Sequence, residues 1–91
     1  MKRNKLNYEI ASEKLLSSLL ESVESELDNN DYYSIKCITQ FIDRVIQGIN
    51  NTKYDKTLFD EDYEYNSMLD HYIQKFNECK LSLISGKTRK K

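Results

Sequence analysis

The segment YNSMLDHYIQKFNECKLSL, residues 65–83, decides the fold of this chain. Its large or apolar side chains recur alternately four and three residues apart, a spacing that lines one face of an α-helix packed against other helices. Upstream, Thr57 followed by Asp60 approximates a capping box, and Ser85-Gly86 can end the helix. The sequence therefore predicts a long helix over residues 58–85. The residues on the repeat are Tyr65, Leu69, Tyr72, Phe76, Cys79 and Leu83.

Two shorter amphipathic helices precede this segment. Residues 8–27 carry an apolar stripe after Asn7, which is a suitable N-cap. Residues 31–49 carry a second stripe that starts with the capping residue Asp31, and Gly48 is expected to help close that helix. Each stripe covers an arc of about 140° at 100° per residue, so each helix has one broad apolar face to bury.

The short link between these two helices favours an antiparallel hairpin. No proline and only two glycines interrupt the helical pattern. We therefore expect an all-α fold, a small three-helix bundle in which the antiparallel hairpin of the first two helices packs against the longer third helix. Its core centre should be formed by the residues in the middle of the three stripes, Leu19, Ile42, Val45, Leu69, Tyr72 and Phe76.

Ninety-one residues form a single domain, 1–91, whose body and ends differ in charge. The formal net charge is −1, but residues 1–6 and 87–91 hold seven of the 14 basic residues. Seven basic residues then remain against 15 acidic ones, so the body carries −8. Such a body is unlike a general nucleic-acid binder, whose domain is usually basic. We expect residues 1–6 and 87–91 to be flexible basic ends.

The composition indicates a soluble, cytoplasmic protein. The first 20 residues lack the pattern of a signal peptide, and no apolar run is long enough to span a membrane. Cys37 and Cys79 lie on separate predicted helices and are expected to be free thiols. Residues with AT-rich codons (Phe, Tyr, Met, Ile, Asn, Lys) number 39, against six with GC-rich codons (Gly, Ala, Arg, Pro). This bias indicates a phage, a plasmid or a low-GC bacterium as the source.

No residue pattern predicts catalysis, a metal site or a cofactor. His71 has Ser67 and Lys75 as its one-turn neighbours, which do not make a metal site, so it is expected at the surface. The acidic run 60–64 lacks the glycine turn of a calcium loop and suits the positive end of a helix dipole. Cys79 falls on the core stripe as a small hydrophobe, and Cys37 has no basic neighbour to activate it. We therefore expect a protein that is not an enzyme.

Some apolar side chains are left outside the three stripes and form a candidate surface for a protein partner. Tyrosine is favoured in such surfaces, and acids nearby would suit a basic rim on the partner. The third helix is also longer than the other two, and its overhanging end predicts a homodimer. The candidate partner-binding residues are Ile10, Tyr33, Cys37, Tyr63 and Leu81.

The leading functional hypothesis is a non-enzymatic protein-interaction module, a regulator or inhibitor that occupies the surface of a partner. The alternative is a nucleic-acid-associated accessory factor that uses its basic ends, which include Lys87, Arg89, Lys90 and Lys91. The size, the helical pattern and the basic tail are also similar to small phage-encoded effectors. More loosely they resemble bacteriocin immunity proteins, which are four-helix bundles with a charged C-terminal segment, and this resemblance implies an immunity-type role.

Overall fold

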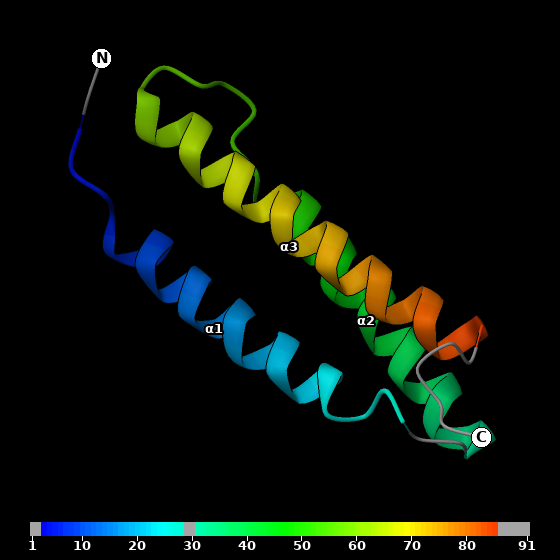
Figure 1. Cartoon of the computed structure of the whole chain (residues 1–91). Helices are drawn as coiled ribbons and strands as arrows, with labels where there is room; N and C mark the ends of the chain where they lie inside the picture. Colours follow the sequence, from blue (N-terminus) through cyan, green and yellow to red (C-terminus); the bar gives the residue numbers. More distant parts are fainter. Residues whose placement is uncertain (1–2, 29–30, 86–91) are drawn as a thin grey trace.

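The computed structural model describes residues 3–28 and 31–85, and this part of the chain contains three α-helices and no strand. They are α1 (Asn7–Glu24), α2 (Tyr32–Thr52) and α3 (Asp60–Ser85). All three lie along one long axis, with α1 antiparallel to α2 and parallel to α3 (Figure 1). The all-α three-helix fold expected from the sequence is confirmed.

α1 begins one residue earlier than expected, because Leu6 rather than Asn7 is the N-cap. The backbone N–H of Leu6 donates to Glu9 Oε1 at 3.0 Å, and the Leu6 carbonyl accepts from the N–H groups of Glu9 and Ile10. The carboxylate of the third helical residue, Glu9, thus accepts the backbone N–H of the N-cap residue. The N-cap residue itself therefore needs no polar side chain. The helix ends at Glu24, and turns follow to Asp28.

α2 is capped as expected but runs further. Asp31 Oδ2 accepts from the backbone N–H of Ser34 at 3.2 Å, which confirms this cap. The helix then continues through Gly48 to Thr52 instead of closing near residue 49. Ile49, the last apolar residue of the stripe, is buried against the core, and beyond it the Thr52 hydroxyl donates to the Ile49 carbonyl at 2.9 Å in the last turn of the helix.

The first turn of α3 is capped by Asp62, not by Thr57. Asp62 Oδ2 accepts from the backbone N–H groups of Leu58 at 2.9 Å and Phe59 at 3.0 Å. These two donors lie just before the helix, where backbone N–H groups otherwise lack partners. α3 ends at Ser85, and the expected glycine cap, Gly86, lies outside the described residues.

The core lies along α3, and nine hydrophobic residues of the described part of the chain are buried in it. Of the six residues expected at its centre, Ile42, Leu69 and Phe76 are at most 1% exposed and are confirmed. Leu19, Val45 and Tyr72 are only half-buried, and they pack against the edge of the core. The buried residues are Leu16, Val23, Ile42, Ile49, Tyr65, Leu69, Phe76, Cys79 and Leu83.

The helices do not pack equally. α2 packs most closely on α3, α1 also packs on α3, and α1 and α2 approach each other least. On α3, Cys79 is 5% and Leu83 only 1% exposed, so the C-terminal part of the apolar repeat is covered within the chain. The expectation that the end of the third helix overhangs with its apolar repeat exposed is therefore wrong for Cys79 and Leu83. This overhang was the reason to expect a homodimer, and self-association itself stays a prediction.

Candidate protein-interaction groove

A buried polar cluster joins the N-terminal segment to α1 and α3. Arg3 Nη2 lies 2.5 Å from Glu9 Oε2 and 2.7 Å from Asp62 Oδ1, and the Arg3 backbone N–H donates to Glu61 Oε1 at 2.7 Å. The Glu9 side chain is only 1% exposed. An arginine between two carboxylates is the geometry in which its planar fork of donors is best used. Arg3 is thus held between carboxylates, Met1 and Lys2 lie outside the described residues, and the flexibility of residues 1–6 stays a prediction.

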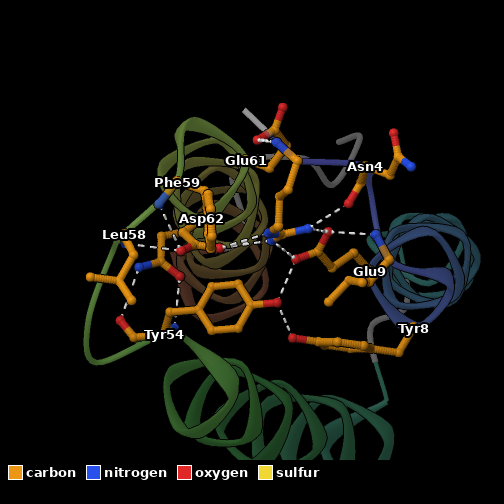
Figure 2. A network of polar contacts seen from close by, with 11 residues as sticks. Asn4, Tyr8, Glu9, Tyr54, Leu58, Phe59, Glu61 and Asp62 are labelled. Atoms are coloured by element: carbon orange, nitrogen blue, oxygen red, sulfur yellow. Dashed lines mark hydrogen bonds and ion pairs between the residues drawn. The ribbon is translucent and has the colours of Figure 1, made fainter. Parts of the chain in front are cut away.

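Two tyrosines complete this polar cluster. The Tyr54 hydroxyl donates to Glu9 and also contacts the hydroxyl of Tyr8, and these side chains converge with Asp62 (Figure 2). Asn66 fixes the backbone of Tyr54, since its Oδ1 accepts from the Tyr54 N–H at 2.9 Å and its Nδ2 donates to the Tyr54 carbonyl at 3.1 Å. The cluster therefore ties α1, α3 and the α2–α3 link together at one end of the bundle.

The pKa values of the cluster follow from its burial and its hydrogen bonds. Burial alone would raise the pKa of the Glu9 carboxyl, but hydrogen bonds from Arg3, from Tyr54 and from the Leu6 backbone outweigh burial and hold it below its ordinary value. The ion pair with Arg3 likewise lowers the pKa of Asp62. Burial and the bond to Glu9 raise the pKa of Tyr54. Carboxylates that stay ionised and a phenol that stays neutral are poorly matched to proton transfer at neutral pH.

The main surface feature is an apolar groove between α1 and α2, which we call the α1–α2 groove. Its first hollow has a volume of about 290 Å³, and Tyr65 and Leu69 of α3 line it together with α1 and α2. Leu15 on its α1 wall is 60% exposed. This hollow exists because α1 and α2 both pack on α3 and not closely on each other. Its α1 and α2 residues are Ser12, Leu15, Leu16, Leu19, Val45, Gly48, Ile49 and Thr52.

Two further hollows continue the groove toward the turn between α1 and α2. Phe41 is 43% and Tyr33 74% exposed there, and Glu26 is the one charged residue in the lining of the three hollows. Exposed apolar side chains gathered in neighbouring hollows make this surface a candidate interaction site. The residues of these two hollows are Ser22, Val23, Glu26, Tyr33, Ser34, Cys37, Ile38 and Phe41.

The structure brings together only part of the partner surface expected from the sequence. All five candidate residues are exposed, but only Tyr33 and Cys37 line the α1–α2 groove. Ile10 lines a separate hollow beside Tyr72. Tyr63 and Leu81 are exposed on α3 and belong to none of the three hollows.

Sequence reasoning missed most of the groove because it assigned these residues to the core. Leu15, Leu19 and Val45 lie on the apolar stripes, and a stripe was expected to be buried along its whole width. The sequence signal that could have identified these groove residues is the width of the apolar stripes. A stripe of about 140° is more than one neighbouring helix covers, and Gly48 within a helix leaves open space beside it.

The structure also places the remaining residues considered in the sequence, Cys79 and His71. Cys79 is buried, as expected, and burial followed by the nearby Glu24 and Glu78 raises the pKa of its thiol. His71 is exposed, with its ring edge-on to Tyr72. The described residues contain no group of three or more histidine, cysteine or acidic side chains placed to hold a metal ion.

The basic C-terminal residues proposed for nucleic-acid contact, Lys87, Arg89, Lys90 and Lys91, lie outside the described residues. At the other end, Arg3 is engaged by carboxylates and is therefore not available to a phosphate. Within residues 3–28 and 31–85, none of the helices combines the length and the apolar character needed to cross a lipid bilayer.

Comparison with known proteins gives no match: no family model, no curated protein and no solved structure is significantly similar to this chain.

Proposed function

We propose that this chain is a non-enzymatic protein-interaction module that binds a partner protein in the α1–α2 groove and acts as a regulator or inhibitor by occupying the partner's surface. The observation that carries the proposal is the run of exposed apolar side chains on both walls of one groove, among them Leu15, Tyr33 and Phe41. Apolar and aromatic side chains at the centre of an interface supply most of its binding energy.

Capture from a lysate of cells that carry the gene tests this proposal, with Gly48→Leu and Gln47→Leu proteins beside the wild type. Gly48 lines the groove and a Cβ there meets no atom within 4 Å, so a leucine at this position starts in open space and places its side chain at the groove. Gln47 is an exposed neighbour that lines none of the three hollows, and it receives the same side chain as a matched control.

We expect a protein that is retained by the wild type and by Gln47→Leu and is lost with Gly48→Leu. Tyr63→Ala should also retain it, because Tyr63 is outside the groove, whereas a partner surface that includes Tyr63 would lose it. Identical capture by the wild type and Gly48→Leu would refute a role for the groove.

A further inference from the structure

The polar cluster contacts every hydrogen-bonding edge of the Arg3 guanidinium group. Five hydrogen bonds reach this group: the carboxylates of Glu9 and Asp62 accept four of them at 2.5–3.2 Å, and the carbonyl of the next residue accepts one at 2.9 Å. The Arg3 Cζ atom also lies over the rings of Tyr54 and Phe59, 5.9 and 6.0 Å from their centroids. An ammonium group has three donors and no planar fork, so it could not make the same contacts.

Both carboxylates are also held by partners other than Arg3. The Tyr54 hydroxyl and the backbone N–H of Leu6 donate to Glu9, and two backbone N–H groups just before α3 donate to Asp62 Oδ2 (Figure 2). The carboxylates are therefore fixed in position by the fold as well as by the cation. The Glu9 side chain is only 1% exposed, and a buried carboxylate without a cation is strongly unfavourable, so this arrangement favours binding of a cation.

The cation comes from a short segment outside the helices. Residues 3–6 precede α1, and the Arg3 side chain reaches Glu9 on α1 and Asp62 on α3. Without the cation between them, these two carboxylates would repel each other across the contact of the two helices. α1 packs on α3 more closely than on α2, so the shared cation helps to hold the N-terminal end of α1 in place.

We infer that this cluster is a binding site for the guanidinium group of an arginine side chain. Its ligands are the carboxylates of Glu9 and Asp62, and its walls are the rings of Tyr54 and Phe59. The chain's own residues 3–6 fill the site as a strap, through Arg3, and thereby fix the N-terminal end of α1 on α3. An arginine of another polypeptide has the same chemistry and would enter the site only where the strap has left it.

Removing the Arg3 side chain and refilling the site with a small guanidinium compound tests this inference. The full-length proteins are the wild type, Arg3→Ala and the matched control Lys5→Ala, which removes a positive charge from an exposed residue of the same segment. The probes are guanidinium chloride and N-acetylarginine amide at up to about 50 mM, well below denaturing concentrations. Sodium chloride and methylammonium chloride at the same concentrations are the controls for ionic strength and for a cation without the planar fork.

We expect both guanidinium compounds to raise the Tm of Arg3→Ala, by about 4–8 °C at about five times the dissociation constant. Methylammonium and sodium chloride should raise it much less. Amide hydrogen exchange in the first turns of α1, residues 8–12, should be faster in Arg3→Ala than in the wild type and should slow again when guanidinium is added. In the wild type and Lys5→Ala, whose site is filled, no probe should raise the Tm more than sodium chloride does.

Several outcomes would overturn the inference. If no guanidinium compound raises the Tm of Arg3→Ala, the cluster is not a guanidinium site, and an equal rise with methylammonium would show that only charge is recognised. An equal rise in the wild type would show that Arg3 does not fill the site. Chemical-shift changes of residues 3–6 in the wild type on addition of N-acetylarginine amide would assign the site to a foreign arginine and not to the strap.

Two further variants locate the binding and guard against misfolding. The double variant Arg3→Ala/Glu9→Gln lacks one of the two carboxylates and should lose the response, and a retained response would place guanidinium binding elsewhere. If Arg3→Ala does not fold, Arg3→Lys decides, because it keeps the positive charge and loses the planar fork. Its Tm should be lower than that of the wild type, and an equal Tm would refute recognition of a guanidinium group.

Discussion

Replacing Gly48 with alanine should make the protein more stable. Gly48 lies in the interior of α2, one turn before the helix ends at Thr52. It is exposed, and a Cβ built on it would meet no heavy atom within 4 Å. The substitution therefore adds no clash and no packing contact, and what remains is the intrinsic difference between the two residues in a helix.

That difference sets the magnitude. Glycine in a helix interior is about 0.8–1.0 kcal/mol less favourable than alanine, chiefly because the unfolded backbone has more freedom to lose. We expect Gly48→Ala to raise the free energy of unfolding by about 0.5–1 kcal/mol. The lower end of this range allows for the position of Gly48 near the end of α2, because helix ends fray. In a domain of this size, 1 kcal/mol corresponds to a rise of about 4–8 °C in Tm.

The sign of the effect distinguishes two structures of this segment. If Gly48 instead closed the helix and did so in a left-handed conformation, alanine would be strained there and would lower the stability. Urea denaturation followed by far-ultraviolet circular dichroism measures the free energy of unfolding directly. Gln47→Ala is the control, because glutamine is already a good helix former and should change little. A destabilised Gly48→Ala protein would refute the continuous α2 and with it the open wall of the groove.

Three further predictions concern the core, the polar cluster and the thiols. Leu69→Ala should lower the free energy of unfolding by about 2–5 kcal/mol, since Leu69 is fully buried, whereas Leu58→Ala should lie within about 0.5 kcal/mol of the wild type because Leu58 is 71% exposed. The pKa of Glu9 is lowered in the folded state, so its contribution is complete above its ordinary pKa of 4.5 and is lost as the pH falls through the folded value. Urea titrations should therefore show a steeper loss of stability below about pH 4.5 for the wild type than for Glu9→Gln. A thiol reagent should modify Cys37 in the native protein, and Cys79 should react only after unfolding; immediate reaction of both would contradict the buried position of Cys79.

The helices could be predicted from the sequence because periodicity is a local property. The stripes of 8–27, 31–49 and 58–85 gave the three elements, and Asp31 gave one correct cap. The other two caps were missed for a common reason. Glu9 and Asp62 act from inside the first turn by accepting backbone N–H groups, and their side chains are fixed by the ion pairs with Arg3. The Arg3–Asp62 ion pair joins positions 59 residues apart, and the Arg3–Glu9 pair joins α1 to the segment before it, so helical periodicity reveals neither.

The candidate site could be predicted only in part, for a different reason. Tyr33 and Cys37 were recognised because they fall outside an apolar stripe. Leu15 and Val45 were not, because a sequence shows that a side chain is on the apolar face but not whether another helix covers it. Coverage depends on the distance between α1 and α2, which is set by their separate packing on α3.

This indirect packing explains why the groove is suited to binding. α1 is held at its N-terminal end by the polar cluster around Arg3 and Glu9 and along its length by contacts of Leu16 and Val23 with the core. These contacts hold α1 in place without the Leu15 side chain, which lines the groove, and without close packing of α1 on α2. The groove is therefore formed in the free chain, and if the proposed function holds, the cost of ordering on binding falls mainly on the partner. Under the proposed function, a partner segment that is already structured in solution should bind more tightly than a disordered segment that makes the same contacts, because less conformational entropy is lost.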